Sequence, residues 1–262
     1  MNPERPPNSR RRRLGSELRA LRVKAGLSQR EAGRRLGFER RKVARIESGE
    51  GTPRQAELEF LLGLYGEDGG ARRTEVLRLA ATAGETGWYE RYEPELARYL
   101  EAESEARRAR IWAPTLIPGL LRTEAYAQAL LGERWDPDLH RARQRRLPGL
   151  SLDVVIWEPV LRVRTGGAAV MRDQLAALLR RGGEPGISIR VLPLETGGHP
   201  AMHGPFSLLD GPLGTPTRVD APCLPDMGHP ADCRQGFTAL ARLSLDTARS
   251  AAMITEISRH MG

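Results

Sequence analysis

The chain has 262 residues, enough for two domains, and carries a formal net charge of +8 with a pI of about 10.2. No apolar run approaches the length of a membrane helix, and two cysteines cannot build a disulfide framework, so we expect a cytoplasmic protein that is neither membrane-spanning nor disulfide-rich. The positive charge is local: residues 1–66 hold sixteen Lys and Arg against eight Asp and Glu, whereas residues 67–262 hold 25 of each sign. A nucleic-acid-binding module joined to a domain with another task has this distribution.

Residues 1–13 contain three prolines and the run Arg10–Arg13, with almost nothing to bury. We therefore expect a disordered basic arm over residues 1–13. Such an arm can lie in a minor groove or on phosphates, although a merely solubilising tail has the same composition.

Residues 14–66 are predicted to form a helical domain with a helix-turn-helix at its centre. Ser28 is a good N-cap, and Glu31 three residues later completes a capping box for a helix that starts at Gln29. Gly37 ends this helix, because glycine adopts the left-handed conformation without steric cost. A second helix after a short glycine-containing turn completes the motif.

The second helix of the motif is expected over residues 40–48, with Val43 and Ile46 facing inward. Its cations are Arg40, Arg41, Lys42 and Arg45. An arginine fork can bind guanine O6 and N7 together, and any cation can bind a phosphate. The alternative is a solvated basic face with no role in nucleic-acid binding.

Several stretches of this domain carry a resemblance to a known family. They are Leu18-Arg19-Ala20-Leu21-Arg22, Gly26-Leu27-Ser28-Gln29, Leu36-Gly37, Val43-Ala44-Arg45-Ile46-Glu47-Ser48-Gly49 and Pro53. Together they resemble the Xre/Cro-type repressor domain, which is lambda-repressor-like and binds double-stranded DNA. The resemblance implies a DNA-binding set made up of Gln29, Arg40, Arg41, Lys42, Ala44 and Arg45.

Individual roles also follow from this resemblance. Gln29 would contact a phosphate, while Arg40 and Arg41 would reach base edges. Ala44 and Arg45 would lie further along the groove.

Two further positions complete the comparison with the repressor domain. Glu47 would be structural and would tie the recognition helix to the loop that follows. Gly33 stands where the family usually has alanine, which fits sterically but costs up to ~1 kcal/mol of helix propensity.

The rest of the chain divides into a linker helix over residues 67–84 and a ligand- or partner-sensing domain over residues 85–262. Helices are expected over 71–83, 94–111, 136–147, 170–181, 231–241 and 244–260, and between Thr123 and Leu131. Strands are expected over 152–157, 187–192, 206–209 and 217–220. Strand, helix, strand in this order predicts a βαβ unit with a right-handed crossover. The fold class is therefore α+β overall: an all-α helix-turn-helix domain, then an α/β domain with a small sheet.

Residues 85–258 carry a second resemblance. Its pieces are Glu103-Ser104-Glu105-Ala106, Ile117-Pro118-Gly119-Leu120-Leu121-Arg122-Thr123, Glu124-Ala125-Tyr126-Ala127, Gln174-Leu175, Val191-Leu192-Pro193 and Phe206-Ser207-Leu208-Leu209. They resemble the domain of unknown function that follows the Xre-type domain in many actinobacterial regulators, some of which are called Scr1-type or antitoxin-like. Arg122 and Asp220 depart from the usual Gln and Glu. The resemblance implies a transcriptional regulator, often paired with a small acidic partner protein, and no established reaction.

One spacing suggests an enzyme. His203 and Asp210 are separated as in the phospholipase-D-type motif, so the C-terminal fold could be phospholipase-D-like and the chain a DNA-tethered phosphodiesterase using His203. However, Pro205 stands where that motif needs a lysine to hold the phosphate, and no second copy is present. We expect no catalytic residue here, and expect Phe206 to lie on a strand that packs against the helix over 170–181.

A metal site is the other alternative. Cys223, His229 and Cys233 could join His199 and His203 as nitrogen and sulfur ligands. Their spacing matches no standard zinc motif, so we expect neither a metal nor a cofactor.

These observations predict a non-enzymatic, sequence-specific DNA-binding transcriptional regulator. We expect a homodimer, since small DNA-binding domains gain affinity when a dimer binds two symmetric half-sites. The C-terminal domain would sense a small acidic partner protein or a small-molecule effector. The alternative is an antitoxin-like module that masks a small partner protein and regulates its own expression.

Overall fold

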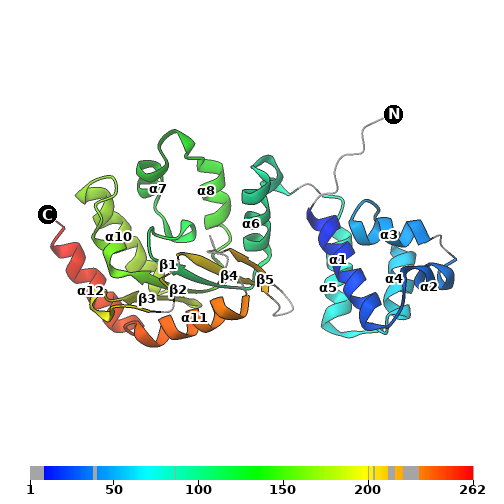
Figure 1. Cartoon of the computed structure of the whole chain (residues 1–262). Helices are drawn as coiled ribbons and strands as arrows, with labels where there is room; N and C mark the ends of the chain where they lie inside the picture. The colour runs from blue at the N-terminus through cyan, green and yellow to red at the C-terminus, as the bar shows by residue number, and fades with distance from the viewer. Residues whose placement is uncertain are drawn as a thin grey trace. The chain divides into compact units, whose positions relative to one another are not determined.

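The computed structural model describes residues 9–37, 40–85, 87–199, 201–202, 204–211, 216–220 and 230–261. The chain divides into two compact units, Met1–Glu101 and Ala102–Gly262. The first unit is helical and the second holds a sheet (Figure 1), which confirms the α+β fold class.

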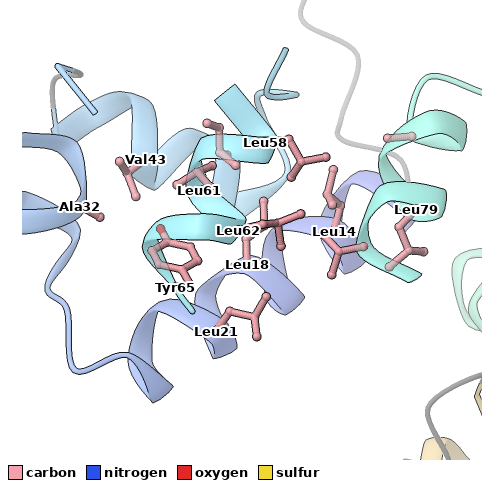
Figure 2. Packing of buried hydrophobic residues seen from close by; sticks show 13 residues of the cluster. Leu14, Leu18, Leu21, Ala32, Val43, Leu58, Leu61, Leu62, Tyr65 and Leu79 are labelled. Carbon is pink, nitrogen blue, oxygen red and sulfur yellow. The ribbon is translucent and has the colours of Figure 1, made fainter. Parts of the chain in front are cut away.

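The N-terminal unit begins with five helices: α1 (Ser9–Lys24), α2 (Gln29–Arg35), α3 (Arg40–Ser48), α4 (Gln55–Leu64) and α5 (Gly70–Thr82). Its core starts from one stripe of α1, in which Leu14, Leu18 and Leu21 recur at helical spacing and are all buried. Figure 2 shows these side chains meeting leucines of α4, including Leu62. The stripe and its partners hold the helix-turn-helix together by burial of apolar surface.

Helix α1 starts earlier than the sequence suggested. The disordered arm expected over residues 1–13 is wrong for residues 9–13, which are helical, and residues 1–8 lie outside the described residues. Arg10 Nη1 donates to Glu85 Oε2 at 2.8 Å, and Arg11 Nε donates to the Ala83 carbonyl oxygen at 3.3 Å. These arginines therefore lie at the C-terminal end of α5, where helix carbonyls attract cations.

Helix α5 belongs to the N-terminal core. We expected residues 67–84 to form a linker helix, and a helix does occupy most of this range. However, Val76, Leu79 and Ala83 are fully buried in the same cluster as Leu14 and Leu18 (Figure 2). The apolar face of α5 thus completes the core of the first unit.

The 3-10 helix η1 (Trp88–Arg91) and helix α6 (Pro94–Glu105) follow, and the division between the two units falls within α6. The sheet of the second unit has the order β3-β2-β1-β4-β5. Its strands are β1 (Arg108–Ala113), β2 (Ser151–Trp157), β3 (Ile187–Leu192), β4 (Phe206–Asp210) and β5 (Pro216–Asp220). Strands β1, β2 and β3 are parallel, whereas β4 and β5 run antiparallel to their neighbours.

The central strand β1 corrects one prediction. We expected a helix over residues 94–111, but α6 ends at Glu105 and the chain enters the sheet at Arg108. Arg108 and Arg110 are not buried and alternate with buried Ala109 and Ile111, whereas Trp112 and Ala113 are both buried, as expected for a central strand that is covered on both faces.

Helices cover both faces of the sheet (Figure 1). The helices that follow α6 in the described residues are η2 (Gly119–Leu121), α7 (Glu124–Leu131), η3 (Gly132–Arg134), α8 (Pro137–Gln144), α9 (Glu158–Arg162), α10 (Ala168–Gly182), η4 (Leu194–Thr196), α11 (Pro230–Leu243) and α12 (Thr247–Arg259). Strands β2 and β3 pair in parallel with α9 and α10 between them, as the predicted βαβ unit requires.

Phe206 packs on the opposite face from the one we expected. It lies in a buried cluster with Leu208 on its own strand and with Phe237 and Leu240 of α11. A Cβ built on Gly236 of α11 would lie 3.9 Å from Phe206 Cζ. The prediction that this strand residue packs against the helix over 170–181 is therefore wrong, because side chains alternate between the two faces of a strand and Phe206 lies on the face that α11 covers.

The edge strand β3 is protected by α12. The Val191 N–H donates to the hydroxyl of Ser250 at 2.9 Å, and the Val191 carbonyl accepts from the Leu245 N–H at 2.9 Å. Ser250 is fully buried. Covering an edge in this way removes the unpaired backbone groups through which sheets otherwise associate.

Candidate nucleic-acid interface

The turn between α2 and α3 has the local geometry that the sequence predicted. The Ser28 N–H donates to Glu31 Oε2 at 2.8 Å, and the Glu31 N–H donates to Ser28 Oγ at 3.1 Å, so the capping box is formed. Gly37 ends the helix with φ of +64°. The hydrogen bonds from Ser28 hold the pKa of Glu31 below its usual range, so this carboxylate stays charged at neutral pH.

Helix α3 is amphipathic in the way a recognition helix needs. Val43 and Ile46 are 1% and 4% exposed and face the core. Arg41 and Arg45 are exposed, and no acidic residue occupies the first turn of the helix. The outer face of α3 therefore presents positive charge along the helix, with Arg41 in its first turn and Arg45 in its last.

One buried carboxylate fixes α3 to the two preceding helices. Glu47 accepts hydrogen bonds from Arg22 Nε at 2.5 Å and from Arg22 Nη2 at 3.0 Å. Glu47 Oε2 also accepts from Gln29 Nε2 at 2.9 Å. Arg22 Nη1 donates to the Leu27 carbonyl oxygen at 2.6 Å, so the same guanidinium also holds the turn before α2.

This network corrects the partner that we expected for Glu47. The carboxylate ties α3 to α1 and α2, rather than to the loop that follows α3, because Arg22 and Gln29 both reach it. The hydrogen bond to Glu47 raises the pKa of Arg22 above its usual value. Burial, and then the charge of Glu47, raise the pKa of nearby Tyr65 to about 12.

The predicted DNA-binding residues fall into three groups. Arg41 and Arg45 are exposed on α3, with Ala44 half-buried between them. Gln29 and Lys42 are already engaged within the unit, since Gln29 donates to Glu47 and the Lys42 ammonium forms an ion pair with Glu57. The backbone of Arg40 begins α3, and its side chain lies outside the described residues.

Sequence reasoning missed the cations of α2. Arg30, Arg34 and Arg35 are all exposed on this helix, whereas Ala32 and Gly33 face the core. The signal was present, because a helix that buries these two small residues must turn its arginines outward. Residues 28–48 contain seven Lys and Arg and three Glu. Two of those carboxylates, in the capping box and in the buried network, serve the motif itself.

Two glycines let α1 approach the end of α3 closely. A Cβ at Gly15 would lie 2.5 Å from the carbonyl oxygens of Ile46 and Glu47. A Cβ at Gly49 would lie 2.7 Å from the backbone nitrogen of Arg12, and its φ of +82° already favours glycine. Backbone atoms cannot give way as side chains can, so the position of α3 depends on these glycines.

Gly15→Ala is therefore expected to lower the stability of the N-terminal unit by ~1–3 kcal/mol, as overpacking typically does. The matched control is Gly63→Ala in α4, where the added Cβ would meet only Asp68 Oδ1 at 3.5 Å. That variant should gain up to ~1 kcal/mol from helix propensity. Thermal melts of both variants test the contrast, and equal effects would show that Gly15 does not set the packing of α3.

Several residues of the two alternative sites in the second unit, the phospholipase-D-type motif and the metal site, lie outside the part of the chain that the structure describes. His203, Cys223 and His229 lie outside the described residues. Cys233 is buried in the core on α11, and the His199 ring stands edge-on to Trp112 at 5.2 Å between centroids. Within the described ranges, no group of three or more His, Cys, Asp and Glu side chains is placed to hold a metal ion. Among the same residues, no helix combines the length and hydrophobicity of a membrane span.

Comparison with known families agrees with both units. Residues 13–76 match a helix-turn-helix domain, which places the first unit in a class of DNA-binding domains. Residues 96–256, more than half of the chain, match the Domain of unknown function (DUF5753), and the chain belongs to this family. No curated protein and no solved structure matches the chain. The helix-turn-helix prediction is thereby confirmed, while the Xre/Cro-type and Scr1-type assignments stay predictions.

Proposed function

We propose that this protein is a sequence-specific transcriptional regulator of the Xre/Cro type that binds double-stranded DNA with α3 in the major groove. The observation that carries the proposal is the exposure of Arg41 and Arg45 on a helix whose opposite face is buried through Val43 and Ile46. An arginine held on a rigid helix can present its planar fork to a guanine with little loss of freedom. The network around Glu47 supplies the rigidity.

The exposed arginines of α2 extend this surface towards the phosphates. Arg30, Arg34 and Arg35 would contact the backbone on either side of the groove, which supplies affinity without sequence information. Gln29 begins α2, and its side-chain Nε2 donates one N–H to Glu47 and has a second N–H that can donate to a phosphate. Binding should therefore weaken steeply as salt is added.

Arg41→Ala is expected to lose ~1–3 kcal/mol of affinity for a specific site and much less for a scrambled duplex, because base contacts carry the specificity. Gln29→Ala should weaken binding to both duplexes alike. Arg19→Ala, an exposed arginine of α1, is the matched control and should change neither. Titration of each variant with both duplexes is the measurement. Equal losses of affinity for the specific and the scrambled duplex would show that Arg41 does not contact a base.

For the second unit we propose dimerisation and the sensing of a small acidic protein or a small-molecule effector. DNA-binding domains of this size gain affinity when a dimer binds two symmetric half-sites, and a separate compact unit can hold two such domains together. We propose no reaction for this unit.

Selection of bound sequences from random DNA with the full-length chain, combined with sedimentation and identification of co-purifying proteins, tests these roles together. Selected sites without two-fold symmetry, bound by a strictly monomeric chain, would contradict the proposed dimer. Recovery of a small toxic protein that the chain inhibits would favour the antitoxin-like alternative.

A further inference from the structure

The two lysines of the chain, Lys24 and Lys42, both form ion pairs with glutamates of the N-terminal unit. Lys42 lies on α3, among the arginines that are proposed to contact DNA bases, and its ammonium contacts the carboxylate of Glu57 on α4. Its side chain is 43% exposed and that of Glu57 is 16% exposed. The pair thus lies at the margin of the surface, where a free ammonium could reach solvent and phosphates.

Glu57 is firmly held in this position. Its second oxygen, Oε2, accepts a hydrogen bond from the Arg54 N–H at 3.0 Å, at the start of α4. A carboxylate at this end of a helix is favoured by the unpaired N–H groups. Burial by itself would raise the pKa of Glu57, but the hydrogen bonds from Lys42 and from the Arg54 backbone outweigh it, and the pKa lies below its usual range. The carboxylate therefore stays ionised wherever DNA binding would be measured.

The chemistry of lysine gives this pair a consequence for DNA recognition. An ammonium is a compact point charge that binds any phosphate, whereas the arginine fork can distinguish a guanine. A free Lys42 would add affinity for every DNA sequence alike. Because Glu57 neutralises the charge of Lys42, positive charge on the outer face of α3 comes from the exposed Arg41 and Arg45, whose guanidinium groups can bind base edges. Specificity is the ratio of the affinity for a specific site to the affinity for other DNA. A lower affinity for other DNA therefore raises the specificity.

We propose that Glu57 is a specificity-determining residue, which withholds Lys42 from the DNA phosphates and so limits sequence-independent binding. This inference rests on the proposed DNA-binding function. It removes Lys42 from the predicted DNA-contact set and makes it a positioning residue that links α3 to the start of α4.

The test measures the salt dependence of binding to a mixed-sequence duplex by the full-length chain, for Glu57→Gln, Lys42→Met and the double variant. Glu57→Gln keeps an oxygen for the Arg54 N–H but removes the carboxylate charge that pairs with Lys42. It should steepen the slope of log K against log salt by about 0.9, one additional phosphate contact, and tighten non-specific binding on the order of fivefold at low salt. Lys42→Met should leave the wild-type slope unchanged. The double variant should behave as Lys42→Met does, because the gain requires the lysine.

Glu67→Gln is the matched control. It breaks the ion pair of the other lysine, Lys24 at the end of α1, whose Nζ lies 3.1 Å from Glu67 Oε1. The slope should stay at the wild-type value. A gain equal to that of Glu57→Gln would show a general charge effect and overturn the inference.

Three other results would also overturn it. They are a shallower slope for Lys42→Met, an unchanged slope for a folded Glu57→Gln variant, and a gain that persists in the double variant. Thermal melts establish folding, and if Glu57→Gln does not fold, the slope for Lys42→Met decides by itself. Absence of binding by the wild-type chain to any duplex would instead contradict the proposed function.

Discussion

Glu47→Ala is expected to lower the free energy of unfolding of the N-terminal unit by ~3–5 kcal/mol, because it leaves a buried guanidinium without its partner. The side chains of Glu47 and Arg22 are only 4% and 9% exposed, and the carboxylate also holds Gln29. Its loss would release α3 from α1 and α2 together. Hydrogen exchange of the α1 to α4 amides in the full-length chain measures this loss of stability locally.

Two comparisons separate the buried pair from charge in general. Glu67→Ala breaks the pair with Lys24, whose side chain is 69% exposed, and should cost at most ~1 kcal/mol. Replacing both buried partners, Arg22→Met with Glu47→Leu, should recover much of the stability, since neither charge is then left unpaired. Similar losses for Glu47→Ala and Glu67→Ala would contradict the central role of this network.

Phe206→Ala is expected to destabilise the second unit by ~3–5 kcal/mol, because truncating a buried phenylalanine leaves a cavity. The ring is 7% exposed and belongs to the cluster between β4 and α11. Val163→Ala, at a side chain that is 58% exposed, should stay within ~0.5 kcal/mol of the wild type. Urea denaturation followed by near-UV circular dichroism is a suitable measurement.

A double-variant cycle then tests which helix the ring contacts. Phe206→Ala should couple to Phe237→Ala on α11 by ~0.5–3 kcal/mol. It should be nearly additive with Leu178→Ala on α10, which covers the other face of the sheet. Strong coupling to Leu178 with none to Phe237 would reverse the assignment of the faces.

Where a short stretch of chain carries its own signal, sequence was a reliable guide. The capping box of Ser28 and Glu31 and the left-handed Gly37 depend on residues a few positions apart, so their spacing is enough to predict the turn of the helix-turn-helix. Strands β2 and β3 and helix α10 also show their periods directly in the sequence. The fold class and the presence of a DNA-binding motif followed from these local signals.

Strand β1 was missed because its signal is short and ambiguous. Ala106 and Ala109 fit the spacing of the preceding helix as well as that of a strand, and both are buried. The strand forms because β2 and β4 pair with it on either side, and β4 is almost 100 residues away in the chain. Propensity in a single window contains no information about such partners.

The same reason limits what the sequence determined about the site. It established which helix would carry the arginines and which residues would face the core. Only the tertiary structure decided which polar side chains are engaged, because Arg22 and Glu47 lie 25 positions apart and Lys42 and Glu57 lie 15 apart. Folding brings Arg10 and Arg11 to the end of α5 in the same way, and so makes part of a predicted arm into helix. An ion pair depends on distances of a few ångströms in space, and a pattern along the chain leaves those distances open.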